Sequence, residues 1–335
     1  MATAVLGAGA TAAGAAGPPP PPKAPGGQTV TQIASGLKTP TSFAFGAGKV
    51  FEGDGGSESS KVPNGGVYLL SGGKGVKLAG SPQFVSGLAW HKNALYIAGG
   101  TLTKRGPVWQ LQRWSGFNGT TFAKRTAIYT APKGFDGFNG IAFGPDGRLY
   151  VGVDLGLTDG NDHGPAGKTP YLYEILSLKA NGSGLKVFAT GMRQPWQMAF
   201  AKGSGAPYVS DLGQDKDAKN PPDFVLRVHQ GDNYGFPKCN WTTGSPCAGY
   251  TKPFKMFAPH TDIMGMAIIG KRLYMTSFEG PGAKGPGGEV LSMSLKGGAV
   301  KPLVTGFVAP TVGLGTDGHS LYIGELTGQV FKVTP

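Results

Sequence analysis

The chain has 335 residues, of which 59 are glycine and 27 proline, against only 15% charged residues. This composition disfavours long helices and favours short strands joined by turns, while 39% hydrophobic residues suffice for a large core. The net charge of +12 is spread without a run of five basic residues, which argues against nucleic acid as a partner but allows electrostatic association with an anionic cell envelope. No segment approaches about eighteen consecutive apolar residues, so we expect no membrane span.

The first 28 residues have the composition of a tail rather than of a folded element. An alanine- and glycine-rich segment leads into a run of prolines at 18–22. Residues 4–16 resemble the end of a signal peptide, with small residues but without a basic start. We therefore expect a secreted, periplasmic or cell-envelope protein whose folded part covers 29–335.

One unit recurs six times along the rest of the chain. It consists of an apolar strand with small residues, a turn, and a second strand of the Leu-Tyr-Ile type. The first strands are expected at 42–45, 86–90, 139–143, 196–200, 264–268 and 311–315, and the second strands at 50–52, 95–97, 149–151, 207–209, 273–275 and 321–323.

Further strands complete most units. Third strands are expected at 67–70, 108–113, 171–178, 224–227, 289–295 and 329–333, and fourth strands at 76–78, 126–129, 185–188 and 300–304. The last unit stops at Pro335 without a fourth strand, and residues 29–33 can supply it. The pattern predicts an all-β fold, a six-bladed β-propeller closed by an N-terminal strand, rather than a β-sandwich.

In such a fold the first strands line a central channel, and the residues at their start gather at one end, the mouth. We expect the chemistry there. The mouth would collect Thr39, Pro40, Phe84, Ser86, Asp136, Asn139, Arg193, Gln194, Trp196, His260, Asp262, Pro310 and Thr311.

Two phrases point to a family. Gly-Met-Arg-Gln-Pro at 191–195 and Asn-Tyr-Gly-Phe-Pro at 233–237 resemble the Gly-x-Arg-Asn-Pro and Asn-Tyr-Gly-Trp-Pro phrases of soluble glucose/sorbosone dehydrogenases, which use pyrroloquinoline quinone (PQQ). The resemblance implies oxidation of a small-molecule sugar, an aldose, at C1 by hydride transfer to calcium-bound PQQ. The second phrase we interpret as structural, with glycine for a turn and aromatic residues for packing.

The same resemblance suggests which residues hold the cofactor. Arg193 occupies the place of an arginine that contacts the quinone, since a guanidinium pairs well with carboxylates, and Gln194 replaces the family's asparagine. Asn139 and Trp196 are assigned to cofactor binding as well. Asp-Leu-Gly-Gln at 211–214 occupies the place of an acid-x-Gly-Pro turn, so that Asp211, Gly213 and Gln214 are expected to hold calcium, the last two through backbone carbonyls.

The catalytic base is where the sequence departs from the family. Phe-Gly-Pro-Asp-Gly-Arg-Leu-Tyr at 143–150 matches a family phrase, and alignment from it puts Asp136 where the family has the histidine that takes the sugar's proton. An exposed carboxylate with a pKa near its usual value of about 4 is a weak base at neutral pH. His260, before the fifth unit, is the other candidate.

Two alternatives remain open. Asn-Gly-Ile-Ala-Phe at 139–143, followed by Pro-Asp-Gly, also resembles gluconolactonase-like propellers, in which the asparagine binds a divalent metal that activates water. Glu52, Asp154 and Glu325 could add oxygen ligands. A non-enzymatic propeller that binds a carbohydrate or a protein at the same mouth is the second alternative.

The chain has two cysteines, Cys239 and Cys247, which flank one loop. Their spacing around a Gly-Ser-Pro turn suits loop closure, and neighbouring histidines lack zinc-ligand spacing. We therefore predict a local disulfide.

Overall fold

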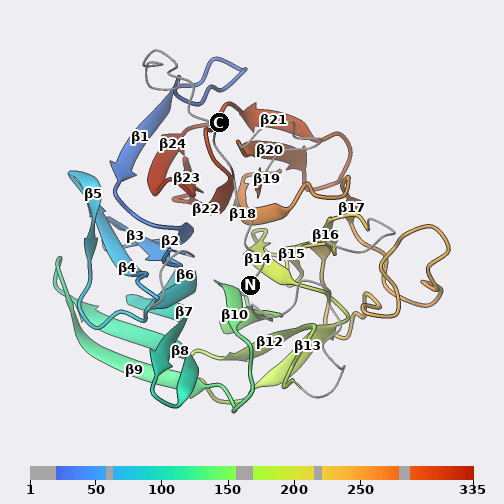
Figure 1. Cartoon of the computed structure of the whole chain (residues 1–335), viewed down its shortest axis with the longest axis horizontal. Coiled ribbons are helices and arrows are strands. Elements are labelled where there is room, and N and C mark those ends of the chain that lie inside the picture. The colour runs from blue at the N-terminus through green and yellow to red at the C-terminus, as the bar shows by residue number, and fades with distance from the viewer. Residues whose placement is uncertain (1–19, 58–62, 156–168, 215–220, 279–286) are drawn as a thin grey trace, which may run out of the picture.

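The structure, a computed structural model, describes residues 20–57, 63–155, 169–214, 221–278 and 287–335. In these ranges the chain forms 24 strands and no helix, and hence no helix that could cross a membrane. The strands form sheets arranged around a centre in the manner of a propeller (Figure 1). The prediction of an all-β fold is confirmed.

Four of the sheets are four-stranded meanders whose strands follow one another in sequence order. The first two are β6 (Phe84–His91), β7 (Ala94–Thr103), β8 (Gly106–Phe117) and β9 (Phe122–Thr130), and then β10 (Phe138–Phe143), β11 (Arg148–Val153), β12 (Glu174–Lys179) and β13 (Lys186–Thr190). The next two are β14 (Pro195–Phe200), β15 (Pro207–Asp211), β16 (Phe224–Arg227) and β17 (Lys255–Met256), and then β18 (Ile263–Ile269), β19 (Arg272–Ser277), β20 (Glu289–Ser294) and β21 (Lys301–Val304).

The fifth sheet has eight strands and contains both ends of the folded chain. Its order is β2 (Pro40–Gly46), β3 (Lys49–Asp54), β4 (Gly66–Ser71), β5 (Gly73–Lys77), β1 (Val30–Ser35), β24 (Gln329–Val333), β23 (Leu321–Glu325) and β22 (Thr311–Thr316). β1 pairs antiparallel with β24, Val30 opposite Val333, and parallel with β5, Ala34 opposite Gly73. The predicted pairing of the N-terminal strand with the last strand is therefore confirmed.

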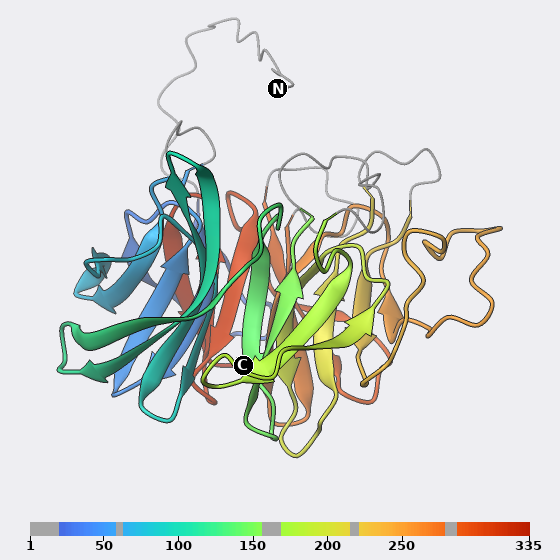
Figure 2. The ribbon, with the colours of Figure 1, turned by 90° about the horizontal axis from the view of Figure 1, so that it is seen from below.

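Three strands differ from the expected pattern. β7 and β8 have ten and twelve residues and extend past the neighbouring sheets, as the teal ribbon in Figure 2 shows. The fourth strand of the β14 sheet, which the sequence did not indicate, is the two-residue β17.

The innermost strands share an irregularity that shapes the mouth. β2, β6, β10, β14, β18 and β22 lie nearest the centre in Figure 1, and each breaks register with its partner near its start. Residues in such a bulge leave the ladder, and their side chains are redirected. The residues without a ladder partner include Asn139, Trp196, Gln197, Met264 and Val312.

Glycine lets four of the six inner strands approach their neighbours closely, whereas β2 and β14 have larger residues at the corresponding place. A Cβ atom on Gly265 would lie 2.5 Å from the Leu314 nitrogen, and one on Gly313 would lie 2.5 Å from the Pro40 oxygen. The corresponding residue of β14 is the buried Gln197, whose Nε2 donates to the Ser86 oxygen at 3.0 Å and the Thr41 oxygen at 3.4 Å. Gln197 thus spans the channel from β14 to β6 and β2.

Beyond Gln197 the channel widens away from the mouth. A cavity of about 430 Å³ is lined there by the later residues of all six inner strands, from Phe45 of β2 to Thr316 of β22. Gln197 therefore lies between this cavity and the mouth.

The hydrophobic core lies between neighbouring sheets. Leu111 of β8 packs in one cluster with Ile141 of β10, and Phe51 of β3 packs with Leu88 of β6. Each sheet is held by its neighbours, as expected of a ring.

The end of the predicted tail contacts the sheets. Lys23 and Thr305 exchange two backbone hydrogen bonds, at 2.8 and 2.9 Å, next to β21. Most of the tail, with the signal-like segment 4–16, lies outside the described residues, and the domain boundary at 28 stays a prediction.

Candidate functional site

The mouth has an apolar floor built from three neighbouring sheets. Its residues come from the starts of inner strands and from the ends of second strands, and they pack as one cluster: Trp196, Leu212, Met264, Phe278, Val312 and Leu326. The bulges place Trp196, Met264 and Val312 here because these residues are free of the ladder.

Asn139, in the bulge of β10, is the most unusual polar residue of the mouth. Its side chain is 1% exposed, and neither Nδ2 nor Oδ1 has a hydrogen-bond partner in the described part of the chain. The indole nitrogen of Trp196 is in the same condition. Because buried polar groups are nearly always paired, these two side chains mark a place where a ligand could complete the hydrogen bonding.

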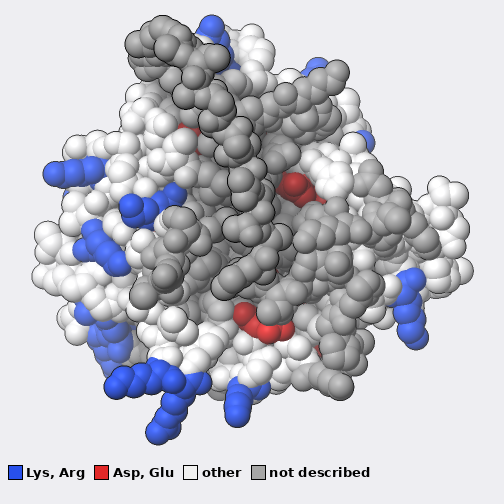
Figure 3. Space-filling view, viewed as in Figure 1, with Lys and Arg blue, Asp and Glu red and all other residues white. Residues whose placement is uncertain are grey.

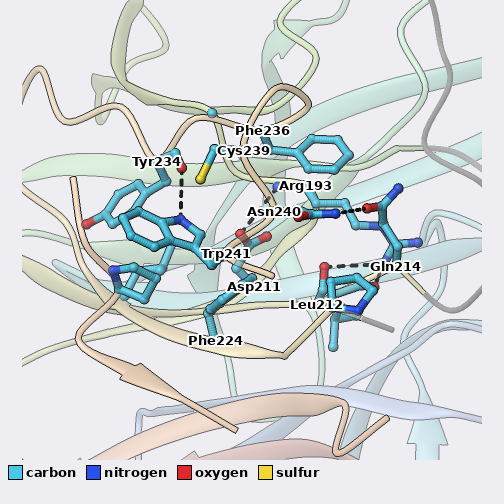
Figure 4. A pocket seen from close by; sticks show the side chains of 15 residues that line it. Arg193, Asp211, Leu212, Gln214, Phe224, Tyr234, Phe236, Cys239, Asn240 and Trp241 are labelled. Atoms are coloured by element: carbon cyan, nitrogen blue, oxygen red, sulfur yellow. Dashed lines mark hydrogen bonds between the residues drawn. The ribbon is translucent and has the colours of Figure 1, made fainter. Parts of the chain in front are cut away.

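Arg193 and Gln194 form a turn that the Asp211 carboxylate holds. The backbone amide of Gln194 donates to Asp211 Oδ1 at 2.7 Å, and the backbone amide of Arg193 donates to Oδ2 at 3.3 Å. The buried Arg193 guanidinium donates through Nη1 to the carbonyls of Leu212, at 3.3 Å, and Gly213. Arg193, the predicted cofactor arginine, is thus in direct contact with the turn at 211–214 that was predicted to hold calcium, here called the metal turn (Figure 4).

Burial raises the pKa of Asp211 to about 7. The hydrogen bond from the Gln194 backbone amide and the charge of the Arg193 guanidinium lower this pKa, and the charge of Asp223 raises it. Both of its oxygens already accept backbone amides. Asp211 therefore acts first as the acceptor that fixes the turn.

A cavity of about 20 Å³ adjoins this turn and is lined by Arg193, Asp211, Gly213, Gln214 and residues of the disulfide loop (Figure 4). Such a volume suffices for a water molecule but not for a quinone. A cofactor would have to bind elsewhere at the mouth, beside Asn139 and Trp196.

The residues predicted for calcium do not fit the ion as they are arranged. The Gly213 carbonyl accepts a hydrogen bond from the Arg193 guanidinium, so a calcium ion bound there would lie against a buried positive charge. Within the described ranges, no group of three or more His, Cys, Asp or Glu side chains could hold a metal.

Asp223 ties the metal turn to the loop of His260, a role that the sequence did not indicate. Its Oδ1 accepts from the Gly213 amide at 2.7 Å, and its Oδ2 from the amides of Thr261 at 2.8 Å and Asp262 at 2.9 Å. His260 directly precedes Thr261 in this loop and has an exposed side chain and a φ of 58°. Asp223 thereby fixes the backbone from which His260 projects.

Asp136 and Gln194 belong to a second connection, between the β10 and β14 sheets. Asp136 is half-buried beside Gly137, whose carbonyl accepts from the Asp154 amide at 2.9 Å. Asp154 Oδ1 accepts from Gln194 Nε2 at 3.1 Å. The side-chain amide of Gln194 is thus hydrogen-bonded to Asp154, a residue that the sequence suggested only as a metal ligand.

The other two acids considered for a metal lie in different settings. Glu325 Oε1 accepts from the amides of Val308, at 2.8 Å, and Ala309, at 3.0 Å. Glu52 is fully buried in β3, and neither carboxylate oxygen has a partner among the described residues. Glu52, Asp154 and Glu325 do not form a common ligand set in the part of the chain described.

The two family-like phrases lie side by side. The Tyr234 amide donates to the Thr190 oxygen at 3.1 Å, and the Phe236 amide to the Gly191 oxygen at 3.0 Å. A side chain on Gly191 would clash with Asn233, so glycine is required there. The phrase at 233–237 thus packs against the turn of Arg193.

The predicted disulfide is confirmed: Cys239 and Cys247 are bonded. The loop between them reaches the metal turn, where Asn240 Nδ2 donates to Gln214 Oε1 at 3.2 Å (Figure 4).

No protein-family model and no curated protein matches the chain. Among solved structures, a putative oxidoreductase (glucose dehydrogenase) from Thermus thermophilus superposes with a TM-score of 0.71 at 20% identity, covering 92% of this chain and 100% of the other. The chain has a glucose dehydrogenase-like fold. This confirms the resemblance at the level of the fold.

Two further structures bear on the alternatives. The PQQ-bound aldose sugar dehydrogenase from Streptomyces coelicolor has a TM-score of 0.67 at 18% identity, covering 93% of this chain and 99% of the other. A putative gluconolactonase has a TM-score of 0.56 at 16% identity, covering 92% and 93%. At these identities the likeness is one of fold.

Proposed function

We propose that this chain is an exported six-bladed propeller that oxidises an aldose at C1, with PQQ as the hydride acceptor. The observation that carries the proposal is the pair of buried, unpaired polar groups at the mouth, on Asn139 and Trp196. The fold it shares with sugar dehydrogenases supports the reaction class, and the disulfide supports export to an oxidising compartment.

Asn139 and Trp196 would hold the quinone directly, while Arg193 and Gln194, whose side chains bond to backbone carbonyls and to Asp154, would shape the turn beside it. The Asn139 amide offers both a donor and an acceptor, the Trp196 indole a donor and an apolar ring, and the floor around Trp196 excludes water from the reacting face. When bound, PQQ takes up the hydride that leaves C1. Asp136 or His260 takes the proton of the C1 hydroxyl, and imidazole is the more common general base.

Calcium belongs to the same resemblance, with Asp211, Gly213 and Gln214 as its assigned residues. We assign no step to it, because the guanidinium on the Gly213 carbonyl leaves the ion without a fitted site.

The gluconolactonase-like alternative is less well supported. It requires Asn139 to share a metal with acidic residues, and Asp154 and Glu325 use carboxylate oxygens on Gln194 and on backbone amides. A non-enzymatic propeller would use the same mouth for a carbohydrate or protein ligand.

The experiment is reconstitution of the purified protein with PQQ, with and without calcium. We expect a bound-quinone absorbance and dye reduction that depends on an added aldose. Quinone binding without turnover would favour a non-enzymatic propeller. Lactone hydrolysis with a divalent metal and without quinone binding would favour the lactonase.

A substitution separates ligand binding from folding at this site. Asn139→Leu keeps the branched shape of the side chain, although leucine is larger, and removes a buried amide that pairs with nothing in the described protein, so the melting temperature should change little. Quinone affinity should fall at least tenfold. The matched control, Asn118→Leu, changes an exposed asparagine in the β8–β9 turn and should leave the affinity unchanged.

A further inference from the structure

Acidic residues are absent from a long part of the sequence. Between residues 59 and 135 there is no Asp or Glu but ten Lys or Arg, whereas the rest of the chain has 21 basic and 19 acidic residues. Nearly all of the net charge of +12 therefore comes from this one segment. The basic residues are spread along the sequence, but the missing acids make the segment strongly cationic.

This segment contains β4, β5 and the whole β6–β9 sheet. Its described basic side chains are exposed except for the half-buried Arg113: Lys74, Lys77, Lys92, Lys104, Arg105, Arg113, Lys124, Arg125 and Lys133. No ion pair with a carboxylate is found for any of them in the described ranges. Figure 3 shows basic side chains along the edge where Figure 1 places β5, β8 and β9.

Basic side chains of this segment lie at both ends of the sheet, along the direction of its strands. Lys92 lies in the turn before β7, and Lys104 and Arg105 lie in the turn after it. The ten residues of β7 span about 34 Å at about 3.4 Å per residue. A flat membrane would touch only one of these two ends, whereas a linear anionic polymer can follow the sheet from end to end.

The surface is poorly suited to stacking on the bases of a single-stranded nucleic acid. No aromatic side chain of this segment is exposed in the described ranges: Trp114 and Phe122 are buried, and Arg125 covers the Trp114 ring at 4.8 Å. Around the basic residues, hydroxyl and amide groups of Thr103, Thr126 and Asn93 are exposed.

We propose that the exposed edge and the end turns of the β6–β9 sheet, with β5, bind an acidic polysaccharide, a linear chain whose carboxylates pair with the basic residues and whose hydroxyls bond to the threonine and asparagine side chains. Lys104 and Arg105 lie on the mouth side of the ring, but the proposal does not depend on the reaction at the mouth.

The test measures binding of polygalacturonate at low and moderate salt, without cofactor or sugar. The variant Lys92→Gln/Lys104→Gln/Lys124→Gln removes three charges from the surface. The control Lys271→Gln/Lys296→Gln/Lys301→Gln removes three exposed charges from the β18–β21 sheet. We expect the first to lose affinity at least tenfold and the second less than threefold, with both melting as the unmodified protein does.

Three results would overturn the proposal. Equal losses in the two variants would mean that only the net charge matters. Absence of binding to polygalacturonate would remove the ligand class. Tighter binding to a duplex DNA oligonucleotide or to phosphatidylglycerol vesicles, lost in the first variant, would assign the surface to those partners instead.

Discussion

Glu52 should make this protein less stable as the pH rises. Burial raises the pKa of its carboxyl group well above the usual value, and the charge of Asp54 raises it further. Because neither oxygen accepts a hydrogen bond from the described chain, nothing compensates a buried charge at this position. The folded protein therefore keeps Glu52 protonated at a pH where the unfolded chain releases the proton.

The size of the effect follows from this difference. The unfolded carboxyl group ionises above about pH 4.5, and below that pH both states are neutral at Glu52. Above it, each pH unit favours the unfolded state by about 1.4 kcal/mol as long as the folded state keeps the proton. The stabilising contribution is thus complete at low pH and is lost as the pH rises toward the raised pKa.

The substitution Glu52→Gln replaces the protonated acid with a neutral isostere that cannot ionise. Urea unfolding at pH 5, 6 and 7 should show the free energy of unfolding of the variant gaining on that of the unmodified protein as the pH rises, by about 1.4 kcal/mol per pH unit as long as the folded state keeps the proton. Glu325→Gln is the matched control: this buried acid accepts backbone amides, so its replacement should destabilise the protein. Parallel pH curves for the unmodified protein and Glu52→Gln would refute the reasoning.

Three further predictions concern the mouth and the ring. Arg193→Ala should lower the free energy of unfolding by about 1–3 kcal/mol, because it leaves the carbonyls of Leu212 and Gly213 without their donor, and it should also weaken PQQ binding. Arg193→Lys should fall between Arg193→Ala and the unmodified protein in both measurements. Unchanged denaturant curves and unchanged PQQ titrations would contradict the two roles. Cys239→Ser/Cys247→Ser should lower the unfolding free energy by about 2 kcal/mol while the sheets stay folded, and a far-ultraviolet spectrum that changes with it would show that the loop supports more than itself. Removal of 1–35, which deletes β1, should lower the melting temperature by several degrees relative to removal of 1–19, and identical melting of the two truncations would show that β1 does not close the ring.

The inner strands could be predicted because their chemistry is local. Most combine a small residue that permits close approach with apolar residues, followed by a turn and a second strand of the Leu-Tyr type. The extension of β7 could not, because Gly99 and Gly100 suggest a turn in sequence. In the structure these glycines serve packing: a Cβ on Gly100 would lie 2.5 Å from the Trp109 ring, and one on Gly99 would lie 2.5 Å from the Phe84 oxygen.

The site was predictable as a set of positions but not as a set of contacts. The turn of Arg193 and the acid at Asp211 were visible, yet the hydrogen bonds between the two turns join residues seventeen to twenty apart. The role of Asp223, which joins Gly213 to Thr261, depends on a distance of 38 residues along the chain. Gln197 resembles any strand residue until the neighbouring inner strands show that glycine is the usual occupant of its place.

The pairing of Val30 with Val333 also sets an order of events in time. β1 leaves the ribosome about 300 residues before its antiparallel partner β24. Until β24 emerges, the first and last sheets each lack one of their two neighbours, however well the intervening sheets have formed. If the chain crosses a membrane unfolded, the ring closes only on the far side, and a protease present there meets an open edge until it does.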